Sequence, residues 1–128
     1  MFEKKMKAVG DVLYIKIISD FGGEIQISEY SKTKSEKFEE LKRNLESYIE
    51  AKKDFMICNK KWEKALYYGI GDEPKAEREA DSALYGMEMF EDRVFDNIKE
   101  IKFFSLNSDE EKLIIEAENI IERHVDDD

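Results

Sequence analysis

The hydrophobic positions near the start of the chain follow the period of β-strands. The segment VLYIKII is rich in β-branched and aromatic residues, and EIQISEY alternates polar and apolar residues. DFGG lies between them and supplies glycines for a tight turn. The pattern predicts a β-hairpin over residues 12–29, formed by Val12–Ser19 and Glu24–Glu29. A lone hairpin is marginally stable in water, so we expect its apolar face to pack on another element.

From residue 34 onward, apolar residues return every three or four positions, which is the period of an amphipathic helix. This pattern predicts helices over residues 34–68, 74–103 and 109–124, with residues 125–128 as an acidic tail. The short connection GIGDEP between the first two helices favours an antiparallel helical hairpin. These helices would be roughly 50 and 45 Å long, so we expect an elongated molecule.

Local signals support the starts of these helices. Two capping boxes are expected, in which a hydroxyl residue is followed three positions later by a glutamate: Thr33 with Glu36, and Ser108 with Glu111. Pro74 suits the first turn of the middle helix, because its missing amide costs nothing there.

Two polar residues interrupt the apolar stripe of the first long helix. Lys52 and Asn59 occupy positions in phase with the core. Polar residues at such positions mark a register device, a kink or an unburied turn. The sequence therefore leaves open whether this helix is continuous or kinked near Asn59.

The fold class expected from these elements is α+β, mostly α. We predict a single domain over residues 1–128, with an N-terminal β-hairpin, a long antiparallel helical hairpin and a shorter C-terminal helix, together forming an elongated three-helix bundle. Charged residues make up 41% of the chain, against roughly 25% in typical globular proteins, which favours long exposed helices. No segment has the length of a membrane span or the pattern of a signal peptide, so we expect a cytoplasmic protein.

The net charge of −10 is distributed unevenly along the chain. Residues 31–71 carry +3, whereas residues 72–101 carry −6 and residues 108–128 carry −7. Four carboxylates of the second predicted helix recur at intervals of four, seven and four, and so share one face: Glu77, Asp81, Glu88 and Asp92. Like charges four residues apart destabilise a helix by a few tenths of a kcal/mol. The stability of the helix was therefore not the only constraint on this face. We interpret it as a partner-binding acidic face.

A second candidate surface is apolar and lies around the turn between the two long helices. It comprises Trp62, Tyr67, Tyr68, Ile70 and Tyr85. Tryptophan and tyrosine are enriched in binding hot spots, and exposed aromatic clusters often mark interfaces. The alternative is that the first helix bends near Asn59 and buries these residues in one core.

No motif in the chain indicates catalysis, a metal site or a cofactor. The single histidine, His124, falls in the last turn of the last predicted helix, and a serine or cysteine nucleophile would need that same residue. EKFE, at Glu36 and Glu39, resembles the first glutamate motif of MazG-type nucleotide pyrophosphohydrolases, but the second motif is incomplete. Cys58 is the only cysteine, which excludes an internal disulfide. We therefore predict no catalytic, cofactor-binding or metal-binding residues, and no enzyme.

Two functions fit these patterns. The first is a small acidic protein that binds other proteins and mimics nucleic acid, occupying a basic surface of a nucleic-acid-handling protein. Mobile-element inhibitors of the anti-restriction or anti-CRISPR type act in this way. The alternative is a homodimeric structural or adaptor module that assembles through the aromatic helical-hairpin tip. Direct nucleic-acid binding by the lysine-rich segment KKDFMICNKKWEK is disfavoured, because the whole chain repels phosphate.

Overall fold

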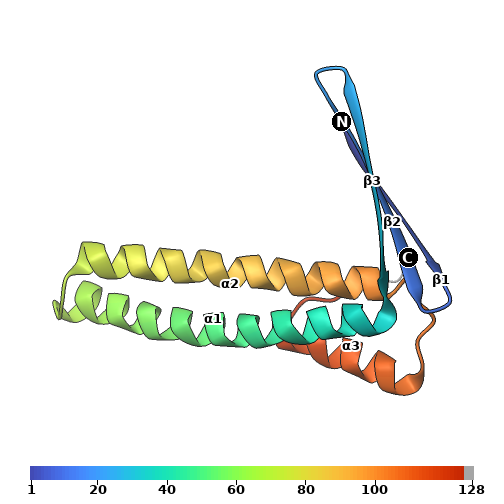
Figure 1. Cartoon of the computed structure of the whole chain (residues 1–128). Helices are drawn as coiled ribbons and strands as arrows, with labels where there is room; N and C mark the ends of the chain where they lie inside the picture. The colour runs from blue at the N-terminus through green and yellow to red at the C-terminus, as the bar shows by residue number, and fades with distance from the viewer. Residues whose placement is uncertain (126–128) are drawn as a thin grey trace.

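The computed structural model describes residues 1–125 and contains a three-stranded antiparallel sheet followed by three helices. The strands are β1 (Phe2–Val9), β2 (Val12–Phe21) and β3 (Glu24–Thr33), and β2 lies in the centre of the sheet. The fold is thus α+β and mostly α, as predicted. Figure 1 shows the sheet projecting steeply away from one end of the two long helices. The predicted acidic tail begins at Val125 and otherwise lies outside the described residues.

The predicted hairpin is present as β2 and β3, but the prediction missed β1, which adds a third strand. Its sequence, FEKKMKAV, has three lysines and an alanine, residues depleted in strands, so its pattern is weak. Pairing with β2 holds it in place, since Gly10 and Asp11 form a tight turn and Val9 pairs with Val12. The strand β3 also runs four residues past its predicted end at Glu29, pairing with the start of β2.

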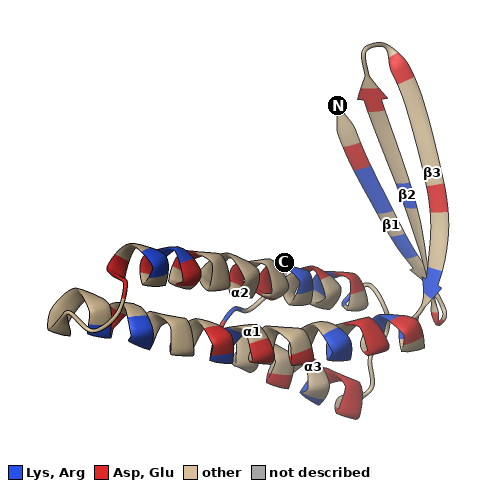
Figure 2. Ribbon diagram, turned by 60° about the vertical axis from the view of Figure 1, so that its left-hand side comes forward, with Lys and Arg blue, Asp and Glu red and all other residues tan. Residues whose placement is uncertain are grey.

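The helices are α1 (Lys34–Tyr68), α2 (Glu73–Ile101) and α3 (Ser108–Ile121). The first is continuous through Asn59, with no kink assigned there, and it begins with the predicted Thr33–Glu36 capping box. Figures 1 and 2 show α1 and α2 side by side along their length, with α3 beside the half of this pair nearer the sheet, where it contacts α2. No helix within residues 1–125 combines the length and apolarity needed to cross a bilayer.

Two details at the ends of α3 differ from the predictions. Its N-cap is Asn107, whose side chain accepts from the Glu110 backbone amide at 2.9 Å, so the capping box lies one residue before the expected Ser108–Glu111 pair. Asn is as good an N-cap as Ser, and sequence spacing alone did not separate the two boxes. The helix ends at Ile121, so His124 lies beyond its last turn.

The buried core is concentrated near the sheet end of the helices. One cluster joins all three helices through Leu41 and Tyr48 of α1, Val94, Ile98 and Ile101 of α2, and Ile114, Ala117 and Ile121 of α3. A smaller cluster packs Leu13 and Ile15 of the sheet against Phe104, which covers part of the sheet face as expected. Toward the far end of α1 and α2, the buried apolar residues are alanines: Ala65, Ala76 and Ala80.

Candidate interaction surfaces

The helix α2 presents its acidic face to solvent because its apolar face is fixed against α1 and α3. Asp72 caps its N-terminus by accepting from the Lys75 backbone amide at 3.3 Å, and Pro74 occupies the first turn. Val94 and Ile98 are fully buried in the core. The orientation of α2 about its axis is therefore set by its apolar residues, and the carboxylates face outward.

The four predicted partner-binding carboxylates are all exposed on α2. Within residues 1–125, Glu77, Asp81 and Glu88 have no hydrogen-bond or ion-pair partner. Asp92 differs, because its Oδ1 accepts from Arg123 Nη1 at 2.8 Å in an exposed ion pair. Figure 2 shows acidic residues on both α2 and α3. Three of the four carboxylates are thus free to engage a partner.

Tyr85 belongs to this acidic face and not to the turn between α1 and α2. It lies four residues after Asp81 and three before Glu88, so the three side chains share one side of the helix. Twelve residues separate it from Glu73, which places it roughly 18 Å along α2 from the turn. Its side chain is 71% exposed. We call the set Glu77, Asp81, Tyr85, Glu88 and Asp92 the acidic stripe.

The turn between α1 and α2 exposes several large apolar side chains. Gly69 ends α1 in the left-handed conformation, with φ 65°, and the Ile70 amide donates to the Lys64 carbonyl at 3.3 Å. Tyr67, Tyr68 and Ile70 are 74%, 77% and 63% exposed, and Leu66 joins them. We call these four residues the tip. The packing here, through small alanines, leaves no cover for the larger side chains.

Trp62 does not belong to the tip, because its side chain lies in a different environment. Its side chain is half-buried, and its indole Nε1 is buried without a hydrogen-bond acceptor among residues 1–125. Of the five residues predicted to form one apolar interface, the structure therefore gathers Tyr67, Tyr68 and Ile70 and leaves the other two elsewhere. The alternative in which a bend buries all five is not observed, since four of them are more than 60% exposed: Tyr67, Tyr68, Ile70 and Tyr85.

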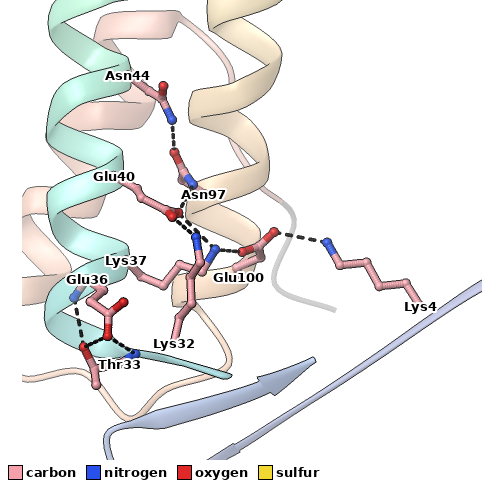
Figure 3. Close-up of polar contacts among 9 residues, drawn as sticks. All are labelled: Lys4, Lys32, Thr33, Glu36, Lys37, Glu40, Asn44, Asn97 and Glu100. Atoms are coloured by element: carbon pink, nitrogen blue, oxygen red, sulfur yellow. Dashed lines mark hydrogen bonds and ion pairs between the residues drawn. The ribbon is translucent and has the colours of Figure 1, made fainter. Parts of the chain in front are cut away.

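A buried polar network connects the sheet to α1 and α2, and no sequence pattern indicated it (Figure 3). Lys37 of α1 forms ion pairs with Glu40 and with Glu100 of α2. The sheet contributes Lys32, which pairs with Glu40, and Lys4, whose Nζ lies 3.2 Å from Glu100 Oε1. Two asparagines extend the network: Asn44 Nδ2 donates to Asn97 Oδ1 at 2.6 Å, and Asn97 Nδ2 donates to Glu40 Oε2 at 3.3 Å.

The network favours the charged forms of Lys37 and Glu40 despite their burial. Burial alone would lower the pKa of Lys37, but hydrogen bonds from its ammonium to Glu100 and Glu40 outweigh it and raise the pKa. Burial likewise would raise the pKa of Glu40, but the bonds from Lys32 and Lys37 lower it. Every cation of the network faces a carboxylate, so these ion pairs connect the sheet to α1 and α2.

A second group of ion pairs joins Lys34 Nζ to Asp11 Oδ1 at 3.5 Å and to Glu110 Oε2 at 3.1 Å. His124 is exposed, with its Nδ1 3.5 Å from Glu118 Oε2. Cys58 is half-buried. Within residues 1–125, no three His, Cys, Asp or Glu side chains lie together in a way that could hold a metal ion.

Comparisons of the chain with protein-family models, with curated proteins and with solved structures find no match.

Proposed function

We propose that this protein is a non-enzymatic, cytoplasmic protein-binding protein whose acidic stripe occupies a basic surface of a nucleic-acid-handling protein. The observation that carries the proposal is the set of three unpaired carboxylates on one exposed side of α2. The ends of the stripe, Glu77 and Asp92, are 15 residues or roughly 22 Å apart, which is long enough to follow a basic groove. Charges arranged in this way accelerate association with a basic partner by electrostatic steering.

Tyr85 adds an apolar contact to the charges of the acidic stripe. Seven residues, or roughly 10 Å, separate Asp81 from Glu88, and the exposed ring of Tyr85 lies in this gap. Tyrosine offers a large apolar contact with a polar end, and it is enriched among binding hot spots. The proposed interface therefore has two carboxylate pairs at its ends and an aromatic anchor at its centre, on a helix held rigid by its buried face.

The test is capture of partners from an extract of the source cells by the immobilised protein. A stripe variant carries Glu77→Gln, Asp81→Asn, Glu88→Gln and Asp92→Asn. A scattered variant changes the net charge equally at exposed acids off the stripe, with Glu50→Gln, Asp54→Asn, Glu79→Gln and Glu111→Gln. We expect the wild type and the scattered variant to capture the same basic protein, and duplex DNA to release it. The proposal is contradicted if the stripe variant still captures the partner. It is also contradicted if the wild type captures the partner while the partner remains bound to DNA.

The exposed tip supports the alternative function, a homodimeric structural or adaptor module. Three large side chains that are each more than 60% exposed, at the far end of a helix pair, form a patch of the kind that mediates association. In this alternative, Tyr67→Ser with Tyr68→Ser converts a dimer into a monomer. Light scattering behind size exclusion measures this, and a tip variant with unchanged dimer mass excludes the alternative.

A further inference from the structure

An open apolar groove runs between α1 and α3, and its lining includes no residue of the acidic stripe or the tip. Six of its apolar lining residues are Phe38, Leu45 and Ile49 of α1 and Leu113, Ala117 and Ile120 of α3. The groove exists because α1 has two adjacent apolar faces. Leu41 and Tyr48 lie in the core, whereas the face that carries Ile49 is only partly covered by α3, and Leu113 remains half-exposed.

The spacing of the groove residues is typical of helices that pack against further helices. The intervals are seven and four on α1 and four and three on α3, as along the seam of a coiled coil. We propose that the groove is the interface of a homodimer, in which α1 and α3 of one copy pack against the same two helices of a second copy.

The charged residues beside the groove are Glu39, Lys42 and Glu46 of α1 and Glu116 of α3. Lys42 and Glu46 are complementary to a second copy of the chain, and neither has an ion-pair or hydrogen-bond partner within residues 1–125. They lie four residues apart on α1. A two-fold axis that crosses α1 at residue 44 pairs the two copies of this helix antiparallel. It places each Lys42 against Glu46 of the partner subunit, which creates two identical ion pairs in a self-complementary interface.

The size of the groove sets the strength of the expected association. The 14 residues of α3 span roughly 21 Å, and two helices packed at 8–10 Å present a face roughly 20 Å wide. The projected face is about 400 Å², whereas a standard interface buries about 800 Å² of accessible surface per partner. We therefore expect a small interface with micromolar affinity. No groove-lining residue comes from α2, so the dimer would carry two unobstructed acidic stripes.

The first test is sedimentation equilibrium of the full chain from about 1 µM to about 0.5 mM, at about 0.1 M and 0.5 M salt. The wild type is expected to pass from the mass of one chain, 15.1 kDa, to twice that mass. Added salt should not abolish the dimer, because its core is apolar and both chains are acidic. A wild type that stays monomeric over the whole range overturns the proposal.

A matched pair of variants then locates the interface. Leu113 and Ile115 are 51% and 54% exposed on α3, but only Leu113 lines the groove. Leu113→Glu should raise the dissociation constant at least about tenfold by burying a charge in the seam, whereas Ile115→Glu should leave it unchanged. Equal effects of the two substitutions, or a dimer lost only with Tyr67→Ser and Tyr68→Ser, would assign the association elsewhere.

Charge reversal provides a test that does not depend on an apolar substitution. Lys42→Glu places like charges together twice in the dimer and should raise the dissociation constant about fivefold. Combining it with Glu46→Lys restores both pairs with reversed sign and should restore the wild-type value. A double variant as weak as Lys42→Glu alone would overturn the proposed two-fold register.

Discussion

Lys37 of α1 and Glu100 of α2 form an ion pair in which the two residues are only 4% and 8% exposed. Removing one member of a buried pair leaves the other charge desolvated. We expect Lys37→Met to lower the free energy of unfolding by at least about 2 kcal/mol, even though Lys4 still reaches Glu100. Urea denaturation measures this. The double variant with Glu100→Met should recover much of the loss, and a single substitution that costs under about 0.5 kcal/mol would contradict the assigned role.

The same network predicts a loss of stability in acid. The pKa of Glu40 is lowered in the folded protein, so the folded state resists protonation that the unfolded chain accepts. The stability from this carboxylate is present above its ordinary pKa of 4.5 and is lost as the pH falls through its folded value. Thermal unfolding between about pH 6 and pH 3 should show a shallower decline in Glu40→Gln than in the wild type. Glu39→Gln, at an exposed neighbouring position, is the control, and equal slopes for all three proteins would refute this origin.

The N-terminus of α3 gives a local test of the capping box. Asn107→Ala removes the acceptor for the Glu110 amide and should lower the free energy of unfolding by about 1 kcal/mol. Ser108→Ala should have almost no effect, because Ser108 is the first residue inside the helix. Urea denaturation of both variants distinguishes the two sites. A larger loss of unfolding free energy from Ser108→Ala than from Asn107→Ala would show that Ser108 is the N-cap, as expected from sequence.

For Trp62, a substitution is predicted to keep or raise the stability of the protein. Its buried indole N–H has no acceptor among residues 1–125, and an unsatisfied buried donor is costly. Trp62→Phe keeps a ring at this position and removes the donor, so the stability should stay the same or rise by up to about 1 kcal/mol. Trp62→Ala removes the packing as well and should be destabilising. A clear loss in Trp62→Phe would mean that the indole N–H has a partner in solution.

The parts of this fold that could be predicted from the sequence are those that local signals determine. The range of α1 agrees with its prediction at both ends, because Thr33 with Glu36 and Gly69 act on the backbone within one turn. The strand β1 was missed because its lysine-rich sequence is held by pairing with β2, which is not a local property. The burial of Lys37 was missed for the same reason. A buried lysine is tolerated here only because Glu40 and Glu100 lie next to it.

The candidate surfaces divide in a similar way. The acidic residues of the stripe could be placed on one face, because the helical period alone determines this. The sequence grouped Tyr85 with Tyr67 and Tyr68 because all three lie near the turn along the chain. The rise of the helix separates Tyr85 from the turn by roughly 18 Å and places it between Asp81 and Glu88. The α1–α3 groove could not be foreseen, because it depends on which face of α1 the third helix covers.

The most direct test of the proposed function is the affinity of the captured partner for the wild type, the stripe variant and the scattered variant at about 0.1 M and 0.5 M salt. The two variants have the same net charge, so only the position of the carboxylates distinguishes them. We predict that the wild type and the scattered variant bind tightly at low salt and weaken steeply at high salt, and that the stripe variant loses at least about tenfold in affinity at low salt. Equal affinities of the stripe and scattered variants would show that the acidic stripe does not recognise the partner.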